Sequence, residues 1–159
     1  MSPLDRMGKP ITILMADDDE EDCELTREAL QDARLANQMK FVHDGQELVD
    51  YLKRRGQYSD PSDAPRPGII LLDLNMPKKD GREALAEIKA DEALRRIPIV
   101  VLTTSKDEED VLRTYDLGAS SFITKPVTFA ALVEVMANWR RYWFEIVELP
   151  NGALADAIG

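Results

Sequence analysis

The sequence predicts an α/β protein built on a doubly wound parallel sheet. Five short apolar segments alternate with five amphipathic segments, and no internal repeat or low-complexity segment interrupts the 159 residues. Such alternation predicts a parallel sheet with helices on both faces, because each right-handed crossover places its helix over the sheet. We therefore expect one domain of five strand–helix units, followed by a C-terminal helical extension.

The first two units differ in how clearly the sequence marks them. Residues 11–16 are apolar, are β-branched at their start and are followed by acids, which indicates a buried strand. Apolar residues then recur at three- and four-residue steps, which predicts a helix over about residues 20–35. Residues 41–42 form a weak second strand. The helix after it is expected to begin near Gly45 and to end before Gly56.

The third, fourth and fifth units follow a proline-rich segment. Residues 56–68 contain three prolines among serine and aspartate, which predicts a surface loop. The three remaining strands are expected at residues 69–73, 98–103 and 121–124. Their helices are expected around residues 84–88, around residues 111–115 with an end at Gly118, and from residue 129 to about residue 144.

The composition excludes several classes of function. The chain has 30 acidic and 20 basic residues, hence a net charge of −10. This excess of negative charge disfavours binding to nucleic acid and to anionic membranes. One cysteine and one histidine supply neither a disulfide nor a zinc cluster. No apolar run approaches the length of a bilayer span, and the N-terminus lacks a signal peptide, so we expect a cytoplasmic protein.

Polar side chains follow four of the five predicted strands. Asp17 and Asp18 come after the first strand, Asp73 ends the third, Thr103 ends the fourth and Lys125 follows the fifth. In an open parallel sheet, ligands bind beyond the carboxyl ends of the strands where the strand order reverses. If the order is the flavodoxin-like 2-1-3-4-5, the three carboxylates lie together, flanked by a hydroxyl and an ammonium.

This combination favours phosphoryl chemistry over separate structural roles. Clustered carboxylates repel one another and need a cation, and oxygen ligands without histidine or cysteine favour Mg²⁺. Lys125 and Thr103 would supply a charge and a hydrogen bond to a phosphoryl group. Each signal alone has another explanation: the acids after the first strand and Thr103 can cap helices, and Asp73 and Lys125 can be turn residues. Four such signals on one edge of a sheet favour a site.

Four segments closely resemble the receiver domains of two-component response regulators. They are residues 13–19, 71–81, 99–103 and 121–126. The resemblance covers about residues 10–145 and implies the flavodoxin-like (βα)5 fold with strand order 2-1-3-4-5. We expect residues 10–145 to be the receiver domain, residues 1–9 an N-terminal arm and residues 146–159 a C-terminal extension.

The resemblance also implies a role for each residue of the acidic cluster. Asp73 would be the phosphoacceptor, which takes the phosphoryl group from a phosphohistidine on a sensor histidine kinase. Asp18, Asp73 and the backbone carbonyl of Asn75 would bind Mg²⁺ directly, and Asp17 would bind it through water. The protein would then catalyse its own phosphotransfer and autodephosphorylation and would act on no separate substrate.

The remaining motif positions imply a switch. Thr103 would hydrogen-bond the phosphoryl group and Lys125 would pair with one of its oxygens, next to a cis Lys125–Pro126 bond. Phe122 occupies the aromatic position that packs inward when Thr103 moves. It stands where a tyrosine is common, so a hydrogen bond from a tyrosine hydroxyl is not available. The change would bias a protein-interaction face formed by the fourth and fifth helices.

The end of the chain suggests how the protein acts. The long proline-rich loop and residues 139–150 resemble stand-alone regulators paired with bacterial phytochromes, and we expect no output domain after the receiver. One apolar stripe of the last helix can face the sheet. A second stripe predicts a symmetric homodimer, and it consists of Val135, Tyr142, Ile146 and Leu149. The alternative is a tail that folds back over its own core.

Two other functions fit parts of the pattern. A phosphatase of the haloacid-dehalogenase kind also uses a Mg²⁺-bound aspartate, but it needs a second aspartate where this chain has Asn75. Its nucleophile also tends to follow the first strand, whereas Asp73 ends the third. A pseudo-receiver would be a docking module that is never phosphorylated, and the intact set of Asp18, Asp73, Thr103 and Lys125 argues against it.

Overall fold

The computed structural model describes residues 11–31, 36–103, 121–128, 130–131 and 134. Five parallel strands form one sheet in the order β2-β1-β3-β4-β5. The strands are β1 (Ile11–Ala16), β2 (Ala36–Val42), β3 (Ile69–Asp73), β4 (Ile99–Thr103) and β5 (Ser121–Thr124). The predicted α/β fold class and the flavodoxin-like strand order 2-1-3-4-5 are thus confirmed.

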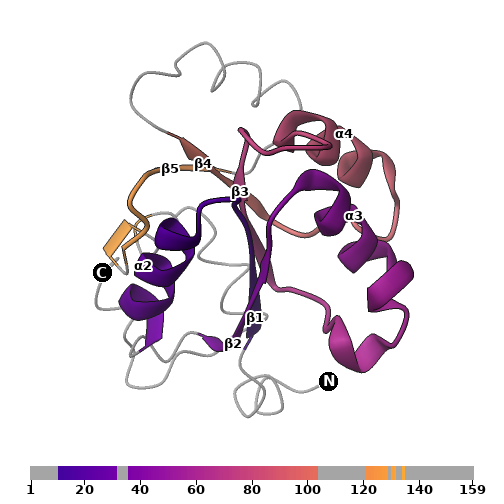
Figure 1. Cartoon of the computed structure of the whole chain (residues 1–159), viewed down its shortest axis with the longest axis horizontal. Helices are drawn as coiled ribbons and strands as arrows, with labels where there is room; N and C mark the ends of the chain where they lie inside the picture. Colours follow the sequence, from indigo (N-terminus) through magenta and orange to yellow (C-terminus); the bar gives the residue numbers. More distant parts are fainter. Residues whose placement is uncertain (1–10, 32–35, 104–120, 129, 132–133, 135–159) are drawn as a thin grey trace.

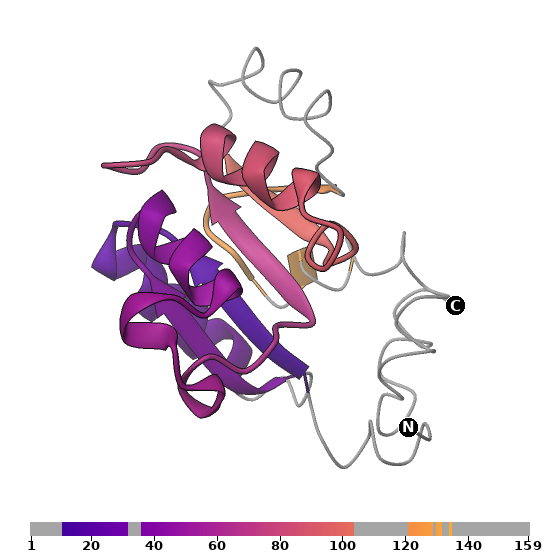
Figure 2. The ribbon, with the colours of Figure 1, turned by 90° about the vertical axis from the view of Figure 1, so that its right-hand side faces the viewer.

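The helices of the described residues cover both faces of the sheet. Helix α2 (Glu20–Gln31) lies on one face, and α3 (Gly45–Lys53) and α4 (Gly81–Ala90) lie side by side on the other (Figures 1 and 2). Two short 3-10 helices, η1 (Gly56–Tyr58) and η2 (Pro61–Asp63), lie within the predicted surface loop. Helices α2, α3 and α4 fall where the apolar periodicity predicts them. The helices expected after β4 and β5 lie outside the described residues, apart from isolated positions of the last one.

The second strand is longer than the sequence predicts. It spans Ala36–Val42 rather than residues 41–42, and its pairing with β1 runs from Ile11 opposite Ala36 to Ala16 opposite Val42. This strand is at the edge of the sheet, so it pairs on one side only, and its Gln38 is exposed. The backbone pairing therefore extends through residues that carry no apolar signal. Residues 32–35, the expected end of the preceding helix, lie outside the described residues.

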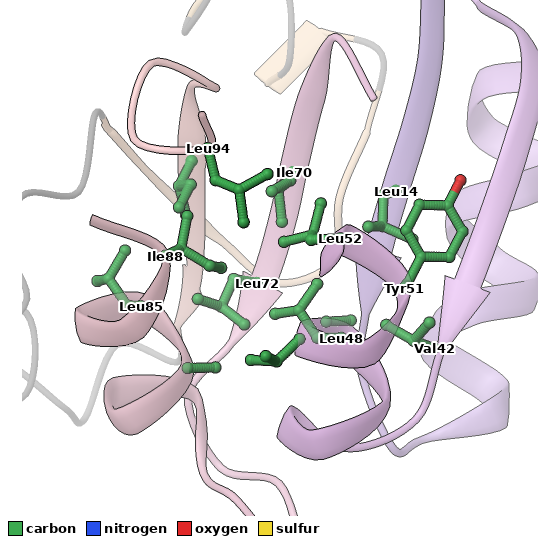
Figure 3. Packing of buried hydrophobic residues seen from close by; sticks show 14 of the residues in the cluster. Leu14, Val42, Leu48, Tyr51, Leu52, Ile70, Leu72, Leu85, Ile88 and Leu94 are labelled. Carbon is green, nitrogen blue, oxygen red and sulfur yellow. The ribbon is translucent and has the colours of Figure 1, made fainter. Parts of the chain in front are cut away.

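The main hydrophobic core lies between the sheet and the layer of α3 and α4. Figure 3 shows side chains of the strands meeting those of the two helices. The labelled contributors are Leu14, Val42, Leu48, Tyr51, Leu52, Ile70, Leu72, Leu85, Ile88 and Leu94. Every residue of β3 is buried, which explains its uninterrupted apolar run. Each fully buried Leu or Ile contributes about 1.5–3 kcal/mol relative to its exposed state.

Two glycines let backbone segments approach closely beside the carboxyl end of the sheet. A Cβ at Gly45, where α3 begins, would collide with the carbonyl group of Lys79. A Cβ at Gly81, where α4 begins, would lie 2.5 Å from the carbonyl oxygen of Asp73 and 2.6 Å from Leu74 Cα. Only glycine fits at these positions, so the segment between β3 and α4 is held against both helix starts.

Within the described ranges, no helix combines the length and the apolar character that crossing a bilayer requires.

Candidate functional site

The register of the sheet brings three carboxylates to one place at its carboxyl edge. Ala16 lies opposite Leu72 on the neighbouring strand, so Asp17 and Asp73 follow at the same level. Asp17, Asp18 and Asp73 each offer a carboxylate oxygen within 4.8 Å of the other two. Asp17 has no solvent exposure, Asp73 is buried and Asp18 is exposed. The cluster therefore has a buried floor and one carboxylate at the surface.

Lys125 brings a positive charge into this cluster from the end of β5. Its Nζ lies 2.8 Å from Asp17 Oδ2 and 3.1 Å from Asp73 Oδ2. Its Nζ also donates a hydrogen bond of 2.8 Å to the Oδ2 of Asp22, which lies in the first turn of α2. The Lys125–Pro126 peptide bond is cis, as the resemblance implies. The ammonium thus partly offsets three carboxylates, which come from the β1–α2 connection, from α2 and from β3.

Short backbone hydrogen bonds fix the carboxylates of the cluster. The backbone N–H of Asn75 donates to Asp73 Oδ1 at 3.1 Å, and that of Asp19 donates to Asp17 Oδ1 at 2.9 Å. These are aspartate turns, in which a side chain bonds the backbone two residues later. In both Asp17 and Asp73, the other carboxylate oxygen, Oδ2, contacts Lys125.

The charges of the site depend on one another. The pKa of Asp17 is raised to about 6, because burial and the charge of Asp73 raise it by more than Lys125 and the N–H of Asp19 lower it. For Lys125, burial lowers the pKa, but the neighbouring carboxylates of Asp17, Asp22 and Asp73 raise it by more. The pKa of Lys125 is therefore raised, and the lysine is cationic at neutral pH.

The donor set fits a divalent cation. Asp17 Oδ2 is buried and accepts no hydrogen bond within the described part of the chain, where it is ion-paired with Lys125. A buried oxygen without a hydrogen bond costs free energy that a cation can recover. The oxygens of Asp17, Asp18 and Asp73 are hard ligands at a spacing that one ion can bridge. The residues present therefore match the chemistry of a divalent-metal site.

The structure brings together some of the predicted site residues and leaves others undescribed. Asp17, Asp18, Asp73 and Lys125 form one cluster, and Asn75 follows it as an exposed residue. The predicted switch residues and the predicted dimer residues are placed only in part. Thr103 ends β4 opposite Thr124, and its side chain is outside the described part of the chain. Phe122 lies half-buried on β5 opposite Val101. All four predicted dimer residues lie outside the described residues: Val135, Tyr142, Ile146 and Leu149.

Three residues at the site were not predicted from the sequence. Asp22 binds Lys125, and its signal is its position four residues after Asp18, in the acidic first turn of α2. The Sγ of Cys23 lies 3.7 Å from the backbone carbonyl oxygen of Asp17, and the Nδ1 of His43 lies 3.2 Å from the same oxygen. For Cys23 and His43 the sequence offers no signal, because both contacts depend on how β1 packs against its neighbours.

The family match, a curated relative and the solved structures all indicate the same family. Residues 13–137 match the response regulator receiver domain. The chain is 40% identical over 146 residues to response regulator Rcp1 from Synechocystis, covering 92% of this chain and 97% of that protein. In the solved Mn²⁺-bound form of Rcp1, the match covers 89% of this chain and 99% of that one, with 40% identity and a TM-score of 0.68.

Two further solved structures are similar over most of their length. The bacteriophytochrome response regulator RtBRR has a TM-score of 0.75 and 36% identity, covering 94% of this chain and 89% of that one. The phosphorylated cyanobacterial phytochrome response regulator RcpA has a TM-score of 0.70 and 41% identity, covering 89% and 99%. The family match over residues 13–137 includes the acidic cluster and Lys125.

Proposed function

The chain belongs to the response regulator receiver family, and we propose that it accepts a phosphoryl group on Asp73 from a sensor histidine kinase. One observation carries this proposal: Lys125 Nζ lies 3.1 Å from Asp73 Oδ2, beside two further carboxylates whose oxygens lie within 4.8 Å of one another. A carboxylate next to an ammonium and a place for a cation provides the nucleophile and the charge neutralisation that phosphoryl transfer needs.

The chemistry is a single displacement at phosphorus. A carboxylate oxygen of Asp73 attacks the phosphorus of the kinase phosphohistidine, the P–N bond breaks, and the histidine nitrogen leaves with the electron pair. A bound Mg²⁺ would supply positive charge for the phosphoryl oxygens and the carboxylates. Asp18, Asp73 and the backbone carbonyl of Asn75 would hold this ion directly, and Asp17 would hold it through water. Lys125 would pair with a phosphoryl oxygen.

The response to phosphorylation involves two further residues. Thr103 would hydrogen-bond the phosphoryl group, and Phe122 would pack inward as Thr103 moves. Phosphorylation adds about −1.5 to −2 charges at this edge, and the rearrangement would bias the protein-interaction face formed by the fourth and fifth predicted helices. Autodephosphorylation, in which water attacks the same phosphorus and releases Asp73, belongs to this proposal.

The partners are proposed from the similar proteins and from the sequence. Because two of them are regulators of phytochromes by name, we infer a phytochrome-type histidine kinase as the phosphoryl donor. We also propose a homodimer through Val135, Tyr142, Ile146 and Leu149. The cytoplasmic location, the absence of nucleic-acid and membrane binding, and the division at residues 1–9, 10–145 and 146–159 stay predictions.

The test is phosphorylation by a small-molecule donor. The protein is incubated with Mg²⁺ and acetyl phosphate or phosphoramidate, and its intact mass is measured. The wild-type protein should gain one phosphoryl group in an acid-stable, base-labile form. The Asp73→Asn variant should gain none, whereas Asp63→Asn, an exposed aspartate in η2, should behave like the wild type.

The other outcomes identify the alternatives. Turnover of many phosphate esters would indicate a phosphatase, and no adduct on the folded wild-type protein would indicate a pseudo-receiver. Neither alternative is favoured, because the chain matches the receiver family over residues 13–137 and has Asn75 where the phosphatases need an aspartate.

A further inference from the structure

Lys125 has a carboxylate partner that the proposed phosphoryl-transfer site does not include. Asp22 Oδ2 accepts a hydrogen bond of 2.8 Å from Lys125 Nζ, which is shorter than the 3.1 Å bond to Asp73. Asp22 lies in the first turn of α2, whereas Asp73 ends β3, so the ammonium is held between a helix and the sheet. The side chains are 26% and 18% exposed for Asp22 and Lys125.

Three carboxylates already surround the ammonium before any phosphoryl group arrives: it donates hydrogen bonds to Asp22 and Asp73 and is ion-paired with Asp17. It has three N–H donors, and three carboxylate oxygens lie within 3.1 Å of it, on Asp17, Asp22 and Asp73. A phosphoryl group on Asp73 needs one of these donors for its own oxygens. Asp17 and Asp73 belong to the acidic cluster, so Asp22 is the partner from outside the cluster that Lys125 can release.

We propose that Asp22 is a positioning residue that holds the Lys125 ammonium toward α2 and competes with the phosphoryl group for it. This inference rests on the proposed function of Asp73. The phosphorylated state forms when Lys125 turns an N–H from Asp22 to a phosphoryl oxygen, and the lost contact subtracts from the stability of that state. The carboxylate of Asp22 also repels the negative charge that arrives.

A role in stabilising the helix start alone does not account for this contact. Acidic residues in a first turn interact favourably with the helix dipole, and Glu20 and Glu21 occupy the same turn. Asp19 accepts hydrogen bonds on its Oδ1 from the backbone N–H groups of Glu21 and Asp22, so it caps the helix. Among these four acids, Asp22 alone is hydrogen-bonded to Lys125 in the described part of the chain.

The test compares two variants with the same change of charge. Beryllofluoride, a phosphoryl mimic that attaches reversibly to a carboxylate oxygen, is titrated by calorimetry into full-length protein in saturating Mg²⁺. We expect Asp22→Asn to bind beryllofluoride about fivefold more tightly than the wild type, because loss of a partly exposed ion pair changes an affinity by about this factor. We expect Asp19→Asn, which keeps a capping side chain, to stay within about twofold of the wild type.

Two further measurements complete the test. Asp22→Glu restores the carboxylate and should return the affinity toward the wild-type value, and Asp22→Ser should act in the same direction as Asp22→Asn. Unchanged or weaker binding by both neutral variants would overturn the inference, as would equal tightening by Asp19→Asn. Failure of the wild-type protein itself to bind beryllofluoride would instead count against the proposed function.

Discussion

Asp17 is the most deeply buried carboxylate of the site. It has no solvent exposure, its Oδ2 lies 2.8 Å from Lys125 Nζ, and burial raises its pKa to about 6. Burial disfavours the ionised form of a carboxyl group relative to its protonated form, and a nearby cation acts against this effect. In the protein without metal, ionised Asp17 therefore reduces the stability of the fold, and a bound cation would offset this loss.

A pH-dependent stability follows from this raised pKa. The ordinary value is 3.8, so the folded protein binds the Asp17 proton more tightly than the unfolded chain does. This contribution to stability is complete below about pH 4 and is lost as the pH rises through about 6. We expect Asp17→Asn to raise the free energy of unfolding by about 2 kcal/mol at about pH 8 in EDTA, and by little at about pH 4.

Urea unfolding with EDTA at both pH values measures this difference. Asp63→Asn, which removes the same charge from an exposed loop, should change the free energy of unfolding by less than about 0.5 kcal/mol at both. A loss of stability in Asp17→Asn at about pH 8 would contradict this account of the site.

For single residues, the sequence predicts which side chains carry the chemistry, but it predicts their contacts less well. Asp17, Asp18, Asp73 and Lys125 could be grouped because each follows a predicted strand and parallel strands end at one edge. Asp22 could not be assigned in this way, because it lies one turn into a helix whose tilt against β5 no local pattern specifies. The partners of a long lysine side chain depend on three-dimensional packing.

Among the elements, the starts of α3 and α4 position the segment that follows Asp73. Gly45 lies against the carbonyl group of Lys79, and Gly81 lies against the carbonyl oxygen of Asp73. The side chain of Asp80 accepts hydrogen bonds from the N–H groups of Arg82 and Glu83, which caps α4 directly after this segment. Lys79 and Lys53 both pair with Glu87, so the segment is also tied to α3 and α4 by charge.

Substitution of Gly45 tests this packing. In Gly45→Ala the new methyl group meets the backbone of Lys79, which cannot turn away like a side chain. We expect a loss of about 3 kcal/mol in the free energy of unfolding, measured by urea unfolding. The control is Gly56→Ala, where φ is +59° but the Cβ meets nothing within 4 Å. It should lose about 1 kcal/mol, and equal losses in the two variants would contradict the predicted close contact.

The elements that the sequence predicts well are those with a one-sided or fully apolar pattern. Strand β3 is buried along its whole length, and α3 places Leu48, Val49 and Leu52 in the core, so both have the expected bounds. Strand β2 was underestimated, because an edge strand needs no apolar residue to pair with β1. The 3-10 helices η1 and η2 have three residues each, too few for any periodicity.

In the whole molecule, the strand order determines where the site lies. Because β1 and β3 are neighbours and β2 lies outside β1, the connections after β1 and β3 leave to opposite faces of the sheet. Helix α2 covers one face and α4 covers the other (Figure 1). Asp17, Asp18 and Asp73 lie together where the two connections diverge, as expected for the switch point of a doubly wound sheet. The alternation of strands and helices predicted a doubly wound sheet, and the strand order implied by the resemblance to receiver domains then predicted this location.

The association state is a prediction from the sequence at this scale. We expect a dimer by light scattering at tens of micromolar, because Tyr142 and Ile146 belong to an apolar stripe apart from the one expected to face the sheet. The change Ile146→Glu should give a monomer, whereas Arg140→Glu, which lies outside the predicted dimer stripe, should leave the dimer intact. A wild-type monomer at that concentration would contradict the predicted interface and would favour a tail that folds back over its own core.

The most direct measurement of the whole account is the position of the phosphoryl group. After incubation with Mg²⁺ and phosphoramidate, borohydride reduction converts an aspartyl phosphate to homoserine, and tandem mass spectrometry of the digested protein locates it. Homoserine at position 73, and at no other aspartate, is the expected result. Homoserine at position 17 or 18 with an unmodified Asp73, or a folded protein that takes up no phosphoryl group, would contradict the account.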